Sequence, residues 1–247
     1  MDKLVYIAAV AAKSAMQRQE QVSNNIANIS TPGFKSQLMA FQAAPIKSDE
    51  GLPTRAYSVE TTVGFDDTEG SLQSTGRDLD MAITGKGWFS VQGANNQEMY
   101  TRAGSFGVSE QGILVNQSGL PIVGEGGEIN IPQTFRIEVS STGAINGFDT
   151  ENPQAAPVVL GQLKLVNPDR AGMERRDDGY FQIKGGGIAE ADESVRVANG
   201  YLENSNVNPA GAMVDMITTQ REFEAHLKMI QMAEENSKSS NSLLGLN

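Results

Sequence analysis

The fold is decided by residues 23–35, which read Ser23-Asn24-Asn25-Ile26-Ala27-Asn28-Ile29-Ser30-Thr31-Pro32-Gly33-Phe34-Lys35. Upstream of this stretch the chain contains neither glycine nor proline, and Pro32 and Gly33 are the first of many. A proline disfavours helical backbone in the residue before it, and the side chains of Asn28 and Ser30 can cap or turn a chain. The stretch therefore predicts the end of a long helix, with Phe34 anchoring the exit.

Glycine and proline divide the rest of the chain in the same way. All 9 prolines lie between Pro32 and Pro209, and all of the 26 glycines except Gly245 lie between Gly33 and Gly211. These two residues are the strongest local interruptions of helices, so segments 1–31 and 212–244 are predicted to be long helices around a turn-rich centre. Asn208 followed by Pro209 is a typical helix start.

Apolar residues recur at heptad-like spacing in both terminal segments. They are Leu4, Ala8, Ala11, Ala15, Val22 and Ile29 near the start, and Met213, Met216, Phe223, Leu227 and Ile230 near the end. Such a seam favours pairing with another helix. Because the N-terminal seam is mostly alanine, it buries little area and needs a partner. The two ends are expected to pair as a coiled-coil-like inner domain, either as a hairpin within one monomer or bundled with neighbouring subunits.

The centre of the chain has the pattern of β-structure. Short apolar runs such as 79–83, 88–91 and 162–166 alternate with turn dipeptides such as Asn146-Gly147 and Asp178-Gly179. This pattern indicates an antiparallel sandwich or a partly open barrel. The fold class is therefore predicted to be α+β. A helical domain is expected from residues 1–34 and 205–247, an extended connector from 35–75, and a β-rich outer domain from 76–204.

The composition excludes several classes of protein. The net charge of −11 and the isoelectric point near 4.6 disfavour binding to nucleic acid or anionic lipid. There is no cysteine, so disulfides, thiolate chemistry and sulfur-ligated zinc are excluded. No apolar run approaches the roughly 20 residues that span a bilayer, and the first residues lack the pattern of a cleaved secretory signal. Neither direct membrane insertion nor a nucleic-acid partner is expected.

Residues for catalysis or metal binding are sparse. The single histidine, His226, lies in the predicted C-terminal helix without a second histidine to share a metal. The acidic clusters at 66–69, 177–178 and 190–193 lack calcium-loop spacing, and the glycine clusters lack the sequence of a phosphate-binding loop. The sequence therefore predicts no enzyme and no catalytic, cofactor-binding or metal site.

The quoted stretch resembles the signature of the flagellar basal-body rod and hook protein family. The resemblance continues through residues 79–91 and 100–106, then through 112–115, 200–209, 213–217 and 220–224, so it covers nearly the whole chain. Within the family the chain looks most like the proximal rod member. The distal rod member of the same family and a secreted β-domain binding module are the alternatives.

The resemblance implies a structural subunit that self-assembles into the hollow drive shaft carrying torque from motor to hook. It implies export by the flagellar type III apparatus without a cleaved signal, and location in the periplasmic rod of the basal body. The implied partners are copies of the chain, other rod proteins, the rod cap and the export apparatus. The expected assembly interface comprises Leu4, Ala8, Ala11, Ala15, Val22, Asn24, Asn25, Ile26, Asn28, Pro32, Gly33, Phe34, Met213, Met216, Ile217, Phe223, Leu227 and Ile230.

Overall fold

The computed structural model describes residues 2–45, 56–93, 96–152 and 154–244. The chain divides into two compact units. One, the helical unit, consists of residues 1–29, 37–65 and 207–247. The other, the β unit, consists of residues 30–36 and 66–206.

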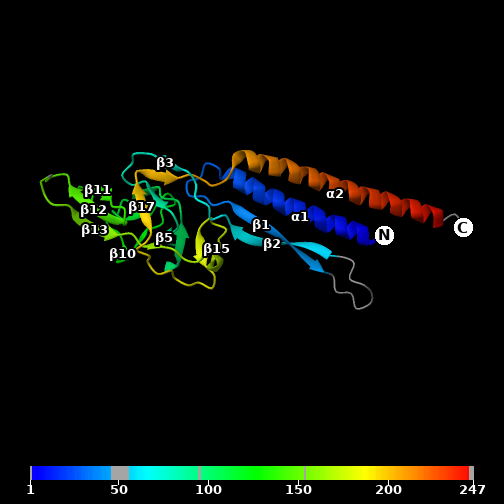
Figure 1. The fold of residues 1–247 in the computed structure, drawn as a ribbon, viewed down its shortest axis with the longest axis horizontal. Helices are drawn as coiled ribbons and strands as arrows, with labels where there is room; N and C mark the ends of the chain where they lie inside the picture. Colours follow the sequence, from blue (N-terminus) through cyan, green and yellow to red (C-terminus); the bar gives the residue numbers. More distant parts are fainter. Residues whose placement is uncertain (1, 46–55, 94–95, 153, 245–247) are drawn as a thin grey trace. The chain divides into compact units, whose positions relative to one another are not determined.

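The helical unit contains two helices and one hairpin. Helix α1 (Asp2–Ala27) and helix α2 (Pro209–Leu244) lie side by side, as Figure 1 shows in blue and orange-red. Strands β1 (Gln37–Pro45) and β2 (Ala56–Phe65) form an antiparallel hairpin that packs beside α1. Helix α2 starts as its sequence predicts, because Asn208 Oδ1 accepts hydrogen bonds from the amides of Ala210 and Gly211.

The β unit is built from short strands. In chain order they are β3 (Leu72–Ser74), β4 (Met81–Thr84), β5 (Trp88–Gln92), β6 (Glu98–Thr101), β7 (Phe106–Val108), β8 (Leu114–Asn116), β9 (Val123–Gly124), β10 (Gly127–Glu128), β11 (Phe135–Val139), β12 (Ala144–Asp149), β13 (Val158–Gln162), β14 (Leu165–Val166), the 3-10 turn η2 (Arg170–Gly172), β15 (Met173–Arg175), β16 (Phe181–Ile183), β17 (Arg196–Asn199) and β18 (Tyr201–Glu203). Every strand pairing among the described residues is antiparallel. The unit is therefore the predicted antiparallel β-rich centre.

The sheets combine pairs of consecutive strands with pairs of strands that are far apart in the sequence. A five-stranded sheet has the order β14-β5-β6-β16-β15, and a three-stranded sheet has the order β11-β12-β13. Smaller pairs join β17 to β4, β18 to β3, β7 to β8 and β10 to β9. The predicted turn at Asp178-Gly179 joins β15 to β16, where Gly179 adopts a φ of 89°, a left-handed conformation that glycine adopts without strain. Strands β17 and β18 bring the end of this unit back to β4 and β3.

One apolar core holds the β unit together. It includes Met81, Phe89, Phe106, Leu114 and Ile145, all buried, with further branched side chains from β8 to β14 and β17. The rings of Phe89 and Phe106 meet edge to face with centroids 5.1 Å apart, a favoured aromatic arrangement. This core gives the unit its own folded interior.

The predicted coiled-coil-like pairing of the two terminal helices is wrong. A coiled coil inserts large apolar side chains of one helix into holes on the other. In α2, however, Met213, Ile217 and Leu227 are exposed, whereas the buried positions are held by Thr219 and Ala233. The apolar spacing in the sequence had assigned the large side chains to the paired face, and the structure places small ones there.

The range 35–75, expected to be a connector, contains β1, β2 and β3. Residues 46–55 of this range lie outside the described residues. In the part of the chain that the structure describes, neither helix is apolar enough over a sufficient length to cross a membrane.

Candidate assembly site

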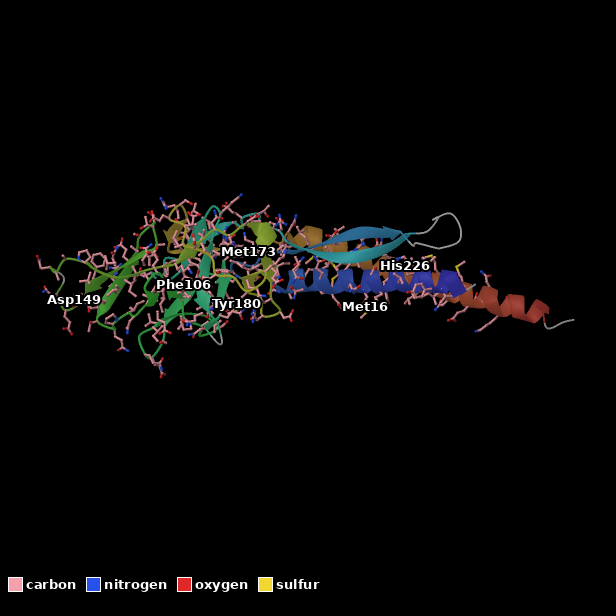
Figure 2. All side chains as sticks on the ribbon, turned by 90° about the horizontal axis from the view of Figure 1, so that it is seen from below. Met16, Phe106, Asp149, Met173, Tyr180 and His226 are labelled. Atoms are coloured by element: carbon pink, nitrogen blue, oxygen red, sulfur yellow. The ribbon has the colours of Figure 1, made fainter. Side chains whose placement is uncertain are left out.

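The predicted interface residues of α1 are divided between buried and half-exposed positions. Ala8, Ala15 and Val22 are buried, Ala11 and Ile26 are half-buried, and Leu4 belongs to α1 with a side chain outside the described residues. Met16, labelled in Figure 2, is an exposed residue of the same helix. The small buried residues therefore serve packing inside the helical unit.

Helix α2 exposes a set of large apolar side chains. Among the predicted residues, Met216, Phe223 and Ile230 are half-buried, whereas Met213, Ile217 and Leu227 are exposed. The exposed fraction is 55% for Met213 and 52% for Ile217. The sequence-based list missed three further exposed residues of the same helix, Val214, Met229 and Met232. Helix α2 thus exposes several large apolar side chains to solvent.

The asparagines at the end of α1 have local structural partners. Asn25 Oδ1 accepts a hydrogen bond of 3.0 Å from the amide of Gln37, and Asn25 Nδ2 donates to the Gln37 carbonyl at 3.2 Å. Gln21 Nε2 donates to the same carbonyl. Asn28 Nδ2 donates to the carbonyl of Asn24 at 2.8 Å, which satisfies a carbonyl of the last helical turn. The amide-rich motif therefore ends α1 and ties the first residue of β1 to it.

Pro32, Gly33 and Phe34 belong to the β unit. The Gly33 amide donates to the Glu203 carbonyl at 2.7 Å, and Gly33 adopts a φ of 70°. A Cβ on Gly33 would lie 2.3 Å from the backbone nitrogen of Ala103, so no larger residue fits. Pro32 is half-buried and Phe34 is buried, so this part of the motif packs within its own subunit.

The ring of Phe34 is covered by a cation. The guanidinium carbon of Arg175 lies 4.5 Å from the ring centroid, within the range of a cation–π interaction. Burial lowers the pKa of this guanidinium from its ordinary value, since a charge is less stable away from water. Phe34 is therefore held by a specific contact and anchors the chain exit, as the sequence indicates.

A buried ionic cluster lies next to Phe34, where the chain leaves α1. Lys35 Nζ donates to Glu203 Oε1 at 2.8 Å and to the Thr68 carbonyl at 2.7 Å, and the Gly70 amide donates to the same carboxylate oxygen at 3.0 Å. Arg102 Nη1 lies 3.3 Å from Glu203 Oε2. The side chains of Lys35 and Glu203 are 0% and 2% exposed. Charges so deeply buried persist only when paired and hydrogen-bonded.

Arg102 is itself fixed by backbone carbonyls. Its Nη1 donates to the Ile83 carbonyl at 3.2 Å, and its Nη2 donates to the Gly85 carbonyl at 2.6 Å. Its guanidinium lies 5.7 Å from the ring centroid of Trp88. The arginine thus connects the carboxylate of Glu203 to strand β4 and the turn that follows it.

Asn206 forms a second node next to the cluster. Its Oδ1 accepts from the Ser36 amide at 2.7 Å, and its Nδ2 donates to the carbonyls of Asp66 and Thr68. Its backbone amide donates to the Phe34 carbonyl at 3.3 Å. One side chain therefore joins three segments that are far apart in the sequence.

Sequence reasoning did not select Lys35, Arg102, Glu203 or Asn206 as site residues, although each lies in a stretch that carries the family resemblance. A signal was available, because Lys35 follows an apolar anchor and Arg102 follows a strand of buried residues. Charged residues in such positions favour a buried pair. Their partners, however, cannot be identified without the fold.

A metal site would need several histidine or carboxylate side chains close together. Among the described residues, no group of three or more histidine, aspartate or glutamate side chains is arranged to hold a metal ion. His226, labelled in Figure 2, is half-buried on α2. Its Nδ1 is buried and has no hydrogen-bond partner within the described part of the chain.

Family models match three parts of the chain in order. Residues 6–35 match "Flagella basal body rod protein", residues 82–147 match "Flagellar hook protein FlgE/F/G D1 domain", and residues 198–243 match "Flagellar basal body rod FlgEFG protein C-terminal". The chain is 39% identical to the flagellar basal-body rod protein FlgF of Salmonella typhimurium over the whole of both chains. The chain belongs to the flagellar basal-body rod protein family.

Other members of the family support the same assignment. The chain is 33% identical to FlgF of Caulobacter vibrioides over 99% of each chain. It is 34% identical to FlgG of Buchnera aphidicola subsp. Acyrthosiphon pisum over 87% of this chain and 89% of that one. The chain is accordingly a structural subunit of the flagellar basal-body rod, most like the FlgF members, and assembles with other rod proteins in the basal body.

Proposed function

We propose that this chain is a subunit of the proximal part of the rod, polymerising into a hollow drive shaft that carries torque from motor to hook without catalytic chemistry. The observation that carries the proposal is the match to FlgF proteins over the full length of the chain. The exposed apolar residues of α2 support it, because several large apolar side chains exposed on one helix are typical of an interaction surface.

The proposed contact surface is the helical unit. Val214 and Ile217 of α2 are 62% and 52% exposed, and Met16 and Tyr6 of α1 are exposed as well. Burying such side chains between subunits removes apolar area from water, which favours association by about 25 cal/mol per Å². Neighbouring copies and other rod proteins are the proposed partners, with the helices forming a shared inner layer and the β units an outer shell.

The route to the rod is part of the same proposal. The subunit leaves the cell through the flagellar type III apparatus without a cleaved signal and adds to the periplasmic rod beneath a rod cap. Few large apolar side chains are buried among the described residues of the helical unit. Its helices therefore gain much of their stability on assembly, and the exported chain stays easy to unfold.

Charged substitutions on α2 test the proposal. In cells that lack the chromosomal copy, the Ile217→Asp and Val214→Asp variants are expected to be missing from isolated basal bodies and to restore less than about a tenth of swimming, because a buried unpaired carboxylate is costly. The measurement is immunoblotting of purified basal bodies together with swimming rates.

Val159→Asp is the matched control. Val159 is also an exposed valine, with 66% of its surface accessible, but it lies on β13 of the β unit. This variant is expected to enter the basal body at the normal level. Normal incorporation of both α2 variants would contradict the proposed interface, and absence of the wild-type chain from basal bodies would contradict the proposed function itself.

One alternative has a specific observation in its favour. The similarity to FlgG proteins, at 34% identity over most of the chain, supports a position in the distal rod. Because FlgF relatives match the chain over its full length and FlgG relatives over 87% to 93% of it, the proximal position is favoured. Labelling the chain in basal bodies broken at defined lengths would distinguish the two positions.

A further inference from the structure

Three segments of the β unit lead to the helical unit. Residues 30–36 lie between α1 and β1, residues 66–70 follow β2, and residues 203–206 precede α2. Together they carry every covalent connection between the two units, at 29/30, 36/37, 65/66 and 206/207. Flexibility in any of these segments would let its end move relative to the ends of the other two, since short polar linkers without fixed contacts sample many conformations.

Two polar nodes bind these same three segments to one another. The first node is the pair Lys35–Glu203, which also engages the Thr68 carbonyl and the Gly70 amide. The second is Asn206, which bonds to the backbone of the first two segments through its side chain. Each node alone touches all three segments, so together they fix the position and the rotation of each segment.

We propose that Lys35, Arg102, Glu203 and Asn206 form a clamp that holds these three segments of the β unit in one fixed arrangement. Arg102 anchors the clamp to the β unit through the carbonyls of β4 and the following turn. The inference deepens the proposed function and rests on it only for the mechanical consequence, which is that the three segments keep one arrangement while the rod is under torsion.

Burial explains why the clamp uses charges. A buried ion pair adds little net stability compared with an apolar pair of the same size, because both charges lose their water. The documented advantage of a buried ion pair is that it favours one arrangement of the chain segments over arrangements in which they are shifted. Lys35 and the Gly70 amide both donate to Glu203 Oε1, and Arg102 lies 3.3 Å from Oε2, so displacement of any one segment breaks at least one of these contacts. The clamp therefore specifies position more than it stabilises the β unit.

Close backbone contacts also hold the three segments in one arrangement. A Cβ on Gly70 would lie 1.8 Å from the carbonyl oxygen of Asn204, and one on Gly33 would lie 2.3 Å from the carbonyl carbon of Arg102. At these two glycines the segments are packed backbone to backbone. Such packing leaves no room for the segments to slide past one another.

Spin labels at the exits test the inference. The chain has no cysteine, so Ser30→Cys and Val207→Cys introduce two unique labelling sites in the full-length subunit. In the unassembled protein, pulsed electron resonance is expected to give one narrow distance distribution. In Lys35→Met and in Asn206→Ala the distribution is expected to broaden at least about twofold, as the segments become flexible linkers.

Two features keep this test interpretable. Lys35→Met leaves Glu203 beside Arg102, so it does not strand a buried carboxylate, and Asn206→Ala removes only a half-buried amide. Trp88, the only tryptophan, is buried in the β unit, so its fluorescence reports whether that unit remains folded. Both variants are expected to retain the wild-type emission.

Lys164→Met is the matched control. Lys164 forms an equally short ion pair with Glu98, at 2.8 Å, within the β unit and away from the three segments. It should leave the distance distribution unchanged. Unchanged distributions in Lys35→Met and Asn206→Ala, or equal broadening in Lys164→Met, would overturn the clamp. Since the free subunit is measured, the clamp can be supported even if Ile217→Asp enters basal bodies normally and the proposed interface fails.

Discussion

At the scale of single residues, Gly33 shows how a helix-stop motif also serves packing. Its left-handed φ turns the chain, its amide binds the Glu203 carbonyl, and its missing side chain lets the backbone of Arg102 and Ala103 approach. Two independent constraints, conformation and space, thus require glycine at one position. A site with only one of these constraints could accommodate another residue at some cost in strain, but the two together exclude every residue except glycine.

Tyr100 should make the β unit sensitive to alkali. Burial raises the pKa of its phenol from 10.0 to about 12, while the Ala189 amide donates a 2.7 Å hydrogen bond to its oxygen. Between these pH values the unfolded chain loses the phenolic proton and the folded chain keeps it. Stability should be fully present below pH 10 and fall by up to about 2 kcal/mol as pH rises to 12.

Urea denaturation followed by Trp88 fluorescence at pH 9 to 12 measures this loss. Tyr100→Phe removes the titrating group, so its stability should depend less on pH over the same range, and Tyr201→Phe, at an exposed tyrosine, should behave like the wild type. Parallel curves for Tyr100→Phe and the wild type would show that Tyr100 does not titrate in this range.

What the sequence can predict of individual residues depends on whether the cause is local. The end of α1 near Asn28 and the start of α2 at Asn208 follow from capping and proline rules that involve neighbours only. The pairing of Lys35 with Glu203 spans 168 positions, and no local rule relates them. The residues that matter most at the exit were therefore recognisable as motif members but not as partners.

At the scale of elements, α2 shows where periodicity misleads. Spacing alone selected Met213 and Leu227 for a paired face, and it did not tell whether the partner lies in the same chain. Within one chain the paired side of α2 holds Thr219 and Ala233, which permit close helix packing but bury little area. Apolar periodicity therefore predicts that one helix face is buried, but it does not identify the protein segment or subunit that buries it.

The exposed methionines of α2, together with Met16 of α1, should be the first to oxidise. Susceptibility follows exposure, and a sulfoxide turns an apolar side chain into a polar one. Met213, Met229 and Met232 are exposed, whereas Met81, Met99 and Met173 are buried in the β unit. Hydrogen peroxide should oxidise the first set at least about tenfold faster in the free subunit.

Peptide mass spectrometry after timed peroxide treatment measures each site. In intact basal bodies the α2 methionines should be protected if neighbouring subunits cover them, and the buried set should stay unmodified in both states. Replacement of these three residues and of Met16 by leucine should make incorporation insensitive to prior peroxide treatment. Equal oxidation of α2 in free and assembled protein would mean that no subunit covers this face.

At the scale of the whole molecule, the net charge and the buried apolar side chains are divided unequally between the two units. The β unit contains 11 basic and 20 acidic residues, a net charge of −9, and the helical unit contains 8 and 10, a net charge of −2. The weakly charged unit also has the exposed apolar helix. Low net charge reduces repulsion between copies, so it favours the helical unit as the surface of self-association.

The two units are also unequal in packing, and this should appear in unfolding. The β unit has a continuous buried core of large side chains, whereas the buried residues described in α1 and α2 are mainly alanine. Regions with few buried apolar contacts open at lower free energy. On heating the free subunit, the helical circular dichroism signal should therefore fall before Trp88 fluorescence changes, with midpoints separated by at least about 10 °C.

The clamp adds a second condition to this prediction. Because Lys35, Glu203 and Asn206 lie in the β unit, the three exit segments should stay protected from amide exchange after the helices have melted. The Gly33 amide, bonded to the Glu203 carbonyl, is the probe to follow. If fluorescence and dichroism change together and Gly33 exchanges with the helices, the chain unfolds as one cooperative body, and the exposed face of α2 belongs to a stable preformed domain.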